Sequence, residues 1–496
     1  MQFHIPYHVY TDKYPTKRLA LYHAIYDYIV SGVLEVHTRM PSSRELAAMY
    51  GLSRGTVNQV YDMLASEGYI ASGVGRGTFV LFRPPGQSRD ECSRDDGYLL
   101  ADWAQRLNEL TGWKEEEISG PKPDGKRSVD FGASGPDLKW FPDKEWNRCL
   151  YAASRQLADG NVQRGRTSVL GDEGLRESIA QYLRRTRGIA ADAKQIAVFN
   201  GSMQGLALTA QLFIGPGDRV VVEHPGYAGA VKAFRALGAV CVHAPIDGHG
   251  IIPEDWEAKL LLVTPNRQFP TGAVLTLKRR QELLAWASAH NSLIIEDDYD
   301  SEFRHRGQSL EPLKVLDRED RVIYMGSFSN TLLPHVRIGY AVLPAALIRL
   351  FARAKALFEP YPSNLLEQKT LAAWMQSGEY ERHLRRMKRV HARKFKLLRE
   401  QLSGRLSSLF TWVEGDVGLN LFGWWRGATE DYIQFRSACL DSGISWSDTE
   451  VQAAHDGSIR RGAYFRFPHL TEEQIVYGVG KMQEIGLTFE AKRQNV

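Results

Sequence analysis

The sequence is poor in cysteine. Its 496 residues include only four, at positions 92, 149, 241 and 439, and no two of them form a CxxC pair. This scarcity argues against a disulfide scaffold and against a cysteine zinc site, so we expect no metal. It fits a protein of the reducing cytoplasm.

Long apolar runs are also missing. Residues 1–18 are polar and lack the apolar segment of a signal peptide. No run approaches the roughly 18 apolar residues that cross a bilayer. We therefore expect a cytoplasmic protein with no membrane partner.

An excess of one charge sign is absent as well. The 62 Lys and Arg residues against 58 Asp and Glu residues give a formal charge of +4, and 43% of the residues are hydrophobic. These are globular proportions, which exclude wholesale disorder. The near-neutral balance does not by itself indicate a nucleic-acid partner.

The chain divides into three regions that differ in composition and in hydrophobic pattern. Residues 14–82 carry short helical patterns and end in a glycine-rich stretch. Residues 83–127 are charged, contain Pro and Gly, and read as a mostly flexible linker with one short helix at 99–110. From 128 to about 490, short β-branched runs alternate with helical patterns. This alternation predicts an α/β domain with a parallel sheet covered on both faces.

A helix-turn-helix pattern occupies residues 41–64. Ser42 and Glu45 form a capping box, Gly51 permits a sharp turn, and Ser53 caps a second helix. The start of such a second helix lies in the major groove of DNA. Its outward side chains, Arg54, Thr56, Asn58 and Gln59, suit phosphates and base edges.

Two short strands follow, at 69–71 and 78–80, around a turn with three glycines and Arg76. A helix-turn-helix followed by such a hairpin is a winged helix. The alternative interpretation is a small helical domain that binds protein.

This stretch resembles the GntR superfamily of winged-helix transcription regulators, through PSSRELA at 41–47, LSRGTVNQVYDML at 52–64, EGYI at 67–70 and GRGTFV at 75–80. The resemblance implies contacts to double-stranded operator DNA. The residues that the resemblance implies for these contacts are Arg44, Arg54 and Thr56, with Gly75 and Arg76 in the wing. Ser42, Ser53 and Asn58 complete the candidate DNA-binding set.

Polar motifs follow several of the later strands. NGSMQG at 200–205 opens a helix whose N–H groups suit a phosphate. Tyr227 suits stacking on a flat ring, and Asp297 suits pairing with a protonated pyridine nitrogen. Residues 326–340 add Ser327, Ser329 and Arg337 for a phosphate. Strand ends are where α/β sheets bind ligands, so the motifs together predict one site.

This region, 128–490, resembles the fold-type I aminotransferases, the pyridoxal phosphate class. A GntR winged helix joined to such a domain resembles the MocR-type regulators, which respond to pyridoxal phosphate and are typically homodimers. The resemblance implies a large sheet with helices on both faces and a small C-terminal α+β subdomain. It places Tyr227 on the cofactor ring, Asp297 on the pyridine nitrogen and Tyr299 on the ring oxygen. The phosphate neighbours it implies are Ser202, Gln204, Ser327 and Arg337, with Met203, Ser329 and Asn330 in the same motifs.

The chain departs from that family at the position of its essential lysine. The family reads GSFSKT, whereas residues 326–331 read GSFSNT, with Asn330 at the lysine position. A carboxamide nitrogen has a delocalised lone pair and cannot form the Schiff base. We therefore expect no catalytic residue, no aminotransferase activity and, at most, non-covalent pyridoxal phosphate.

A second departure concerns the arginine that grips a substrate carboxylate in the family. Alignment on the C-terminal strand places Tyr464 at its position and Arg466 two residues later, on the same face of the strand. Either Arg466 partly compensates, or carboxylate recognition is weakened or lost.

The stretch 382–399 holds nine Lys and Arg residues and no acid, beside an apolar helical stripe. It is either a second DNA contact that follows phosphates or a solvated face of a packed helix.

The leading hypothesis is a dimeric transcription regulator with a degenerate aminotransferase-like domain that binds a small effector. The effector is pyridoxal phosphate or its amino-acid adduct, or an unrelated metabolite; alternatively the domain is only a dimerisation scaffold. The rival hypothesis is an aminotransferase tethered to DNA.

Overall fold

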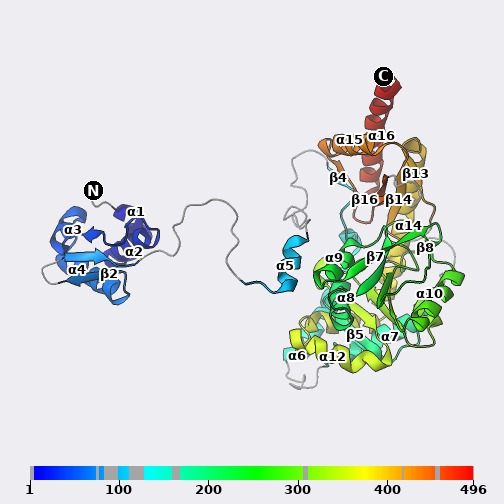
Figure 1. Cartoon of the computed structure of the whole chain (residues 1–496), viewed down its shortest axis with the longest axis horizontal. Helices are drawn as coiled ribbons and strands as arrows, with labels where there is room; N and C mark the ends of the chain where they lie inside the picture. Colours follow the sequence, from blue (N-terminus) through cyan, green and yellow to red (C-terminus); the bar gives the residue numbers. More distant parts are fainter. Residues whose placement is uncertain are drawn as a thin grey trace. The chain divides into compact units, whose positions relative to one another are not determined.

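The computed structural model describes residues 5–73, 77–82, 99–110, 128–158, 168–304, 311–415, 418–452 and 459–494. It divides the chain into two compact units, Met1–Leu99 and Leu100–Val496 (Figure 1). Among the described helices, none is long and apolar enough to span a membrane.

The first unit is the expected winged helix. Its elements are α1 (Tyr7–Thr11), α2 (Lys17–Val30), β1 (Arg39–Met40), α3 (Ser43–Tyr50), α4 (Arg54–Ser66), β2 (Ile70–Gly73) and β3 (Gly77–Val80). The strands form an antiparallel sheet in the order β1-β3-β2. The apolar faces of α2, α3 and α4 meet in one core, in which Leu46, Val57 and Leu64 are fully buried.

Local capping explains where α3 and α4 begin. The predicted capping box is confirmed: Ser42 Oγ accepts from Glu45 N, and Glu45 Oε2 accepts from Ser42 N at 2.8 Å. Ser53 Oγ accepts from Thr56 N at 3.0 Å. Gly51 adopts φ +62°, a left-handed conformation that glycine reaches without strain, and ends α3.

The short helix expected at 99–110 is α5 (Asp102–Glu109). It packs against α9 (Ala228–Ala236), where Arg106 Nε donates to the Ala236 carbonyl at 2.9 Å. This part of the predicted linker therefore belongs to the second unit.

The second unit is built on an eight-stranded sheet in the order β5-β12-β11-β10-β9-β6-β7-β8. Its strands are β5 (Ile196–Phe199), β6 (Arg219–His224), β7 (Val240–Asp247), β8 (Gly250–Ile251), β9 (Leu260–Val263), β10 (Leu293–Asp298), β11 (Val322–Ser327) and β12 (Gly339–Val342). The sheet is mixed rather than wholly parallel, because β12 runs antiparallel to both neighbours and β8 runs antiparallel to β7.

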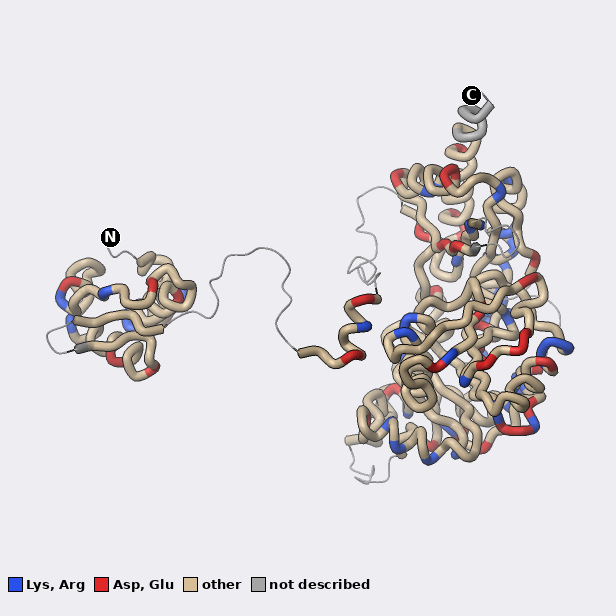
Figure 2. The backbone as a smooth tube through the Cα atoms, viewed as in Figure 1, with Lys and Arg blue, Asp and Glu red and all other residues tan. Residues whose placement is uncertain are grey.

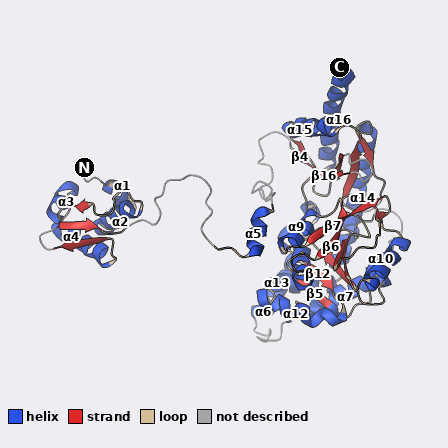
Figure 3. Ribbon diagram, in the orientation of Figure 1, coloured by secondary structure: helices blue, strands red, loops and turns tan. Residues whose placement is uncertain are grey.

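Helices cover both faces of this sheet, as Figure 3 shows. Alternate strand residues pack on one face against α8, α9 and α12, and on the other against α6, α7, α10 and α13. Besides α9, the helices around this sheet are α6 (Asp143–Ala158), α7 (Glu173–Arg187), α8 (Ser202–Phe213), α10 (Leu277–Ala289), α11 (Leu313–Leu316), α12 (Ile348–Phe358) and α13 (Leu365–Gln376). Short 3-10 turns lie at Leu138–Trp140, Ala193–Gln195, Pro334–Val336 and Ala345–Leu347.

The small C-terminal α+β subdomain is also present. The long helix α14 (Glu379–Arg405) leads into an antiparallel sheet in the order β13-β14-β17-β16. Its elements are β13 (Phe410–Trp412), β14 (Asn420–Trp425), β16 (Ser447–Gln452), β17 (Ile459–Arg466), α15 (Thr429–Asp441) and α16 (Glu472–Gln494), and β4 (Val129–Asp130) pairs with β15 (Ile444–Ser445).

Candidate functional site

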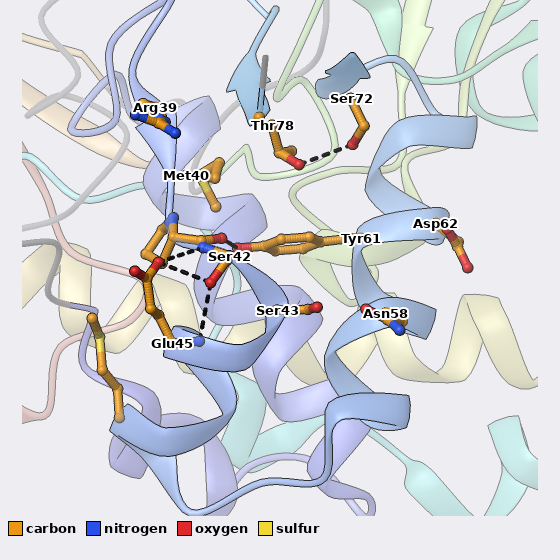
Figure 4. Close-up of a pocket in the computed structure, with 13 residues that line it drawn as sticks. Arg39, Met40, Ser42, Ser43, Glu45, Asn58, Tyr61, Asp62, Ser72 and Thr78 are labelled. Carbon is orange, nitrogen blue, oxygen red and sulfur yellow. Dashed lines mark hydrogen bonds between the residues drawn. The ribbon is translucent and has the colours of Figure 1, made fainter. Parts of the chain in front are cut away.

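A groove of about 660 Å³ lies on the first unit, between the start of α3, the middle of α4 and the three strands (Figure 4). Tyr61 lines it, and its hydroxyl donates to the Pro41 carbonyl at 2.7 Å. That bond joins α4 to the entry of α3 and so holds the two helices of the motif together.

Most of the predicted DNA-binding side chains face solvent. Ser42, Arg44, Ser53, Arg54 and Asn58 are exposed, and Thr56 is half-buried. The Thr56 and Ser53 hydroxyls lie 2.8 Å apart, which fixes the first turn of α4. Gly75 and Arg76 of the predicted wing lie outside the described residues.

Arg39 is a groove residue that the sequence motifs did not single out. It is exposed on β1, and a Cβ on Gly77 of β3 would lie 3.2 Å from its Nε atom. Its position beside the wing depends on the β1–β3 pairing, which no helical pattern signals. The only sequence signal was a basic residue just before PSSRELA.

The charge of the groove is mixed. Glu45 and Asp62 line it together with Arg39, and hydrogen bonds from Ser42 lower the pKa of Glu45. Figure 2 likewise shows acidic and basic residues interspersed over this unit. DNA affinity here depends on particular contacts rather than on a broad positive field.

In the second unit, strand ends bring the predicted ligand residues to one edge of the sheet. Asp297 of β10 pairs in register with Met325 of β11. Ser327, at the end of β11, pairs with Gly339, which in turn pairs with Phe199 at the end of β5. The motifs after β5, β10 and β11 therefore converge there.

Asp297 is the least satisfied polar group of this cluster. Its Oδ1 atom is buried and has no hydrogen-bond partner within the described part of the chain. Burial, reinforced by the charges of Asp298 and Asp300, raises the pKa of Asp297 to about 7. The Asp297 carboxylate therefore lacks a hydrogen-bond donor, and a protonated pyridine nitrogen is such a donor.

Tyr299 and Asn330 are neighbours, as the motifs implied. Asn330 Nδ2 donates to the Tyr299 carbonyl at 2.9 Å. The Tyr299 hydroxyl accepts from Arg267 Nη1 at 2.7 Å, and the same nitrogen lies 3.0 Å from Asp300. Arg267 also holds Asn420 of β14, which ties the small subdomain to the large sheet.

Aromatic rings gather around Phe269. The ring centroids of Tyr227, Tyr299 and Tyr464 lie 6.1, 5.7 and 5.4 Å from that of Phe269, each in edge-to-face geometry. This cluster places Tyr464 beside the predicted cofactor residues. Arg267 and Phe269 belong to the motif TPNRQFPTG, which follows β9. The sequence analysis did not identify either of them as a site residue.

Arg466 lies close to the same group. Burial lowers its pKa, while Asp300, Tyr299 and Tyr464 act in the opposite direction. No hydrogen bond or ion pair of its guanidinium is found within the described residues. Arg466 is therefore a cation near Tyr464 without a dedicated partner.

The predicted phosphate-binding residues differ in whether other protein groups already engage their side chains. The Arg337 guanidinium lies against the turn that begins α8, because a Cβ on Gly201 would be 2.6 Å from its Nη2 atom. Ser327 Oγ donates to Ser329 Oγ at 2.9 Å, and Ser202 is half-buried in the first turn of α8. Met203 packs on the core, and Gln204 accepts from Asn200 N at 2.7 Å, so the protein itself already engages these two side chains.

Comparison with known proteins agrees with both units. Residues 17–80 match the model of the bacterial regulatory proteins of the gntR family, and residues 144–475 match that of aminotransferase class I and II. These matches define the class: a gntR-type DNA-binding domain fused to an aminotransferase-like domain.

Relatives that match along most of the chain identify the family more closely. The chain is 33% identical to the probable rhizopine catabolism regulatory protein MocR of Rhizobium meliloti, over 95% of this chain and 94% of that protein. It is 31% identical to the pyridoxine biosynthesis transcriptional regulator PdxR of Corynebacterium glutamicum, over 75% and 76%. The chain belongs to the MocR-type family of regulators.

Solved structures support the fold of the second unit. Kynurenine aminotransferase of Pyrococcus horikoshii superimposes with a TM-score of 0.66 at 24% identity, covering 77% of this chain and 97% of that one.

Asp297→Asn is expected to stabilise the ligand-free protein increasingly as the pH rises. A folded-state pKa raised from 3.8 to about 7 means that the wild-type carboxylate destabilises the fold as it ionises. The free-energy difference should be near zero below pH 4 and should level off at about 4 kcal/mol above pH 7. Chemical denaturation of both proteins across this range measures it.

Asp143→Asn is the control, since Asp143 is exposed on α6. A difference between wild type and Asp297→Asn that does not vary with pH would show that the pKa of Asp297 is not raised.

Proposed function

We propose that the protein is a transcription regulator in which the winged helix reads an operator and the aminotransferase-like domain binds an effector non-covalently. The observation that carries the proposal is the gntR-type winged helix fused to an aminotransferase-like domain, in which the motif GSFSNT offers Asn330 where the family pattern has its lysine. The Asn330 amide donates to the Tyr299 carbonyl and offers no nucleophile.

On the DNA side, α4 enters the major groove with its first turn foremost. Arg44 and Arg54 bind phosphates, Asn58 reads a purine edge, and Thr56 contacts a base or a methyl group. Arg39 joins them as a phosphate contact between the wing and α4.

Pyridoxal phosphate fits the second site. The unpartnered Asp297 oxygen suits its ring nitrogen, and Tyr227, which is 38% exposed, offers a ring face. Arg337 at the start of α8 suits its phosphate. The name of the related pyridoxine biosynthesis regulator supports this ligand class.

Three other lysines, Lys314, Lys355 and Lys278, are either paired with a carboxylate or exposed. Lys314 Nζ lies 2.7 Å from Asp320, Lys355 Nζ lies 2.7 Å from Glu359, and Lys278 is exposed on α10. Because Asn330 supplies no amine, we propose that the ligand is held without a covalent bond and that the protein does not catalyse transamination.

Arg466 gives the effector a further feature. It lies on the same face of β17 as Tyr464 and close to Tyr299, which follows β10, and this supports partial compensation for the family's missing arginine. An effector with a carboxylate, such as a pyridoxal phosphate–amino acid adduct, fits this cation better than pyridoxal phosphate alone.

A second copy of the chain would cover an apolar patch. Leu357, Phe358 and Tyr361 are 83%, 69% and 70% exposed, which is unusual for three large side chains so close in sequence. They flank Glu359, which accepts from Ser363 Oγ and from Gln204 Nε2. We assign this patch to a homodimer contact next to the ligand site.

The competing function is an aminotransferase with a DNA-tethering module, favoured only by the intact fold. Amino-group transfer above a no-protein control, lost in Asp297→Asn, would establish it. The absence of such transfer under the same conditions is the expected result.

Operator binding tests the proposed function. The protein is expected to bind one promoter segment far more tightly than random DNA, and Arg54→Ala should weaken that binding by roughly 1–3 kcal/mol. Electrophoretic mobility shift at fixed salt measures both. Equal affinity for random and promoter DNA would refute the proposal.

Gly55→Ala is expected to stabilise the fold and weaken DNA binding. A Cβ there meets nothing closer than Ser53 Oγ at 3.8 Å, so the protein itself has room for it. Alanine should add up to about 0.5 kcal/mol of helix stability, less than in a helix interior because Gly55 is the second residue of α4, whereas DNA pressed against the first turn of α4 would clash with the added methyl group. Thermal unfolding and operator titration measure the two effects.

Gly404→Ala is the matched control, since Gly404 lies within α14 and its Cβ also has open space. It should raise stability and leave DNA binding unchanged. Operator affinity equal to wild type in Gly55→Ala would contradict close approach at this turn.

A further inference from the structure

One face of the second unit concentrates exposed arginines. We define the basic face by its residues: Arg184 and Arg185 on α7, and Arg382, Arg385, Arg386 and Arg389 on α14. On α14 these positions recur every three or four residues, which places them on one side of the helix. The bond between Arg185 Nη2 and Glu381 Oε1, at 2.6 Å, joins the two helices.

Acidic neighbours neutralise only part of this face. Arg185 pairs with Glu381, and Arg382 pairs with Glu379. Arg386 lies over the ring of Trp140, 5.9 Å from its centroid. Within the described residues, no ion pair holds Arg184, Arg385 or Arg389.

Farther along α14 the charges are compensated. Arg393 pairs with Glu472 of α16, and Lys396 lies 3.9 Å from Glu400. The uncompensated cations are thus confined to the first half of the helix, next to the end of α7.

Packing of α14 does not require these arginines. Its opposite side supplies the contacts with the core, where Leu384, Met387 and Phe395 are buried. Arg385 and Arg389 stand four residues apart, a spacing at which like charges destabilise a helix. An ordinary solvated face would mix acids among them, but residues 382–399 contain none.

We infer that the basic face binds the phosphate backbone of duplex DNA beyond the base pairs read by α4. Guanidinium groups match phosphate geometry, and flexible arginines on one helix face can follow a strand without reading sequence. From Arg382 to Arg389 the helix advances about 10 Å, which corresponds to roughly three phosphates along one strand. The inference rests on the proposed DNA-binding function and extends it to the second unit.

The test compares two duplexes and two full-length proteins. One duplex is the minimal operator defined by footprinting, and the other extends it with unrelated sequence on both sides. Wild type and Arg385→Gln/Arg389→Gln are titrated with each at several salt concentrations. Glutamine keeps the helix propensity, and thermal unfolding confirms that the variant is folded.

The wild type is expected to bind the long duplex more tightly and with a steeper salt dependence. The double variant should lower the slope of log K against log salt by about 2 on the long duplex, and should bind the minimal operator as the wild type does. Lys278→Gln/Arg318→Gln removes two exposed cations elsewhere on the unit and should behave as wild type.

Two results would overturn the inference while leaving the proposed function intact: no gain from the longer duplex in the wild type, or a gain that the double variant retains. An equal loss in Lys278→Gln/Arg318→Gln would also overturn it, because the effect would then follow net charge. Failure of the proposed function appears differently, as the absence of any preferred operator.

Discussion

An unpaired carboxylate at the end of β10 is the constraint on which the ligand site depends. Asp297 is half-buried, its buried Oδ1 atom has no hydrogen-bond partner among the described residues, and its pKa is raised to about 7. A fold retains such a group at a cost in stability, and a ligand cation offsets that cost when it binds. The surrounding elements follow from this requirement: the rings near Phe269 close one side, and Arg337 lies at the start of α8.

In the proposed function, Asn330 allows ligand binding at this site without covalent catalysis. Its amide donates to the Tyr299 carbonyl, which links the GSFSNT loop to the end of β10. The Tyr299 hydroxyl is in turn held by Arg267, which also binds Asn420 of the small subdomain. A ligand that contacts Tyr299 would therefore touch the chain of contacts that links the large sheet to the small subdomain.

Local patterns predicted much of this structure. Short stretches of sequence determine the capping box at Ser42, the turn at Gly51 and the strand that ends near Asp297. Each of them occurs as expected. Features that depend on distant pairings were not predictable in this way. Arg39 reaches the groove through the β1–β3 pairing, β12 is antiparallel to its neighbours, and Arg267 meets Asn420 across more than 150 residues. The roles of the site residues rest on the proposal rather than on these patterns.

The most direct test of the account is the operator affinity of the wild-type protein before pyridoxal phosphate is added, in its presence, and after dialysis. The account predicts a change in affinity that dialysis reverses, no response in Asp297→Asn, and covalent retention of the ligand only in Asn330→Lys. Operator affinity that never responds, or wild-type protein that keeps the ligand covalently, as shown by mass spectrometry after borohydride reduction, would contradict it.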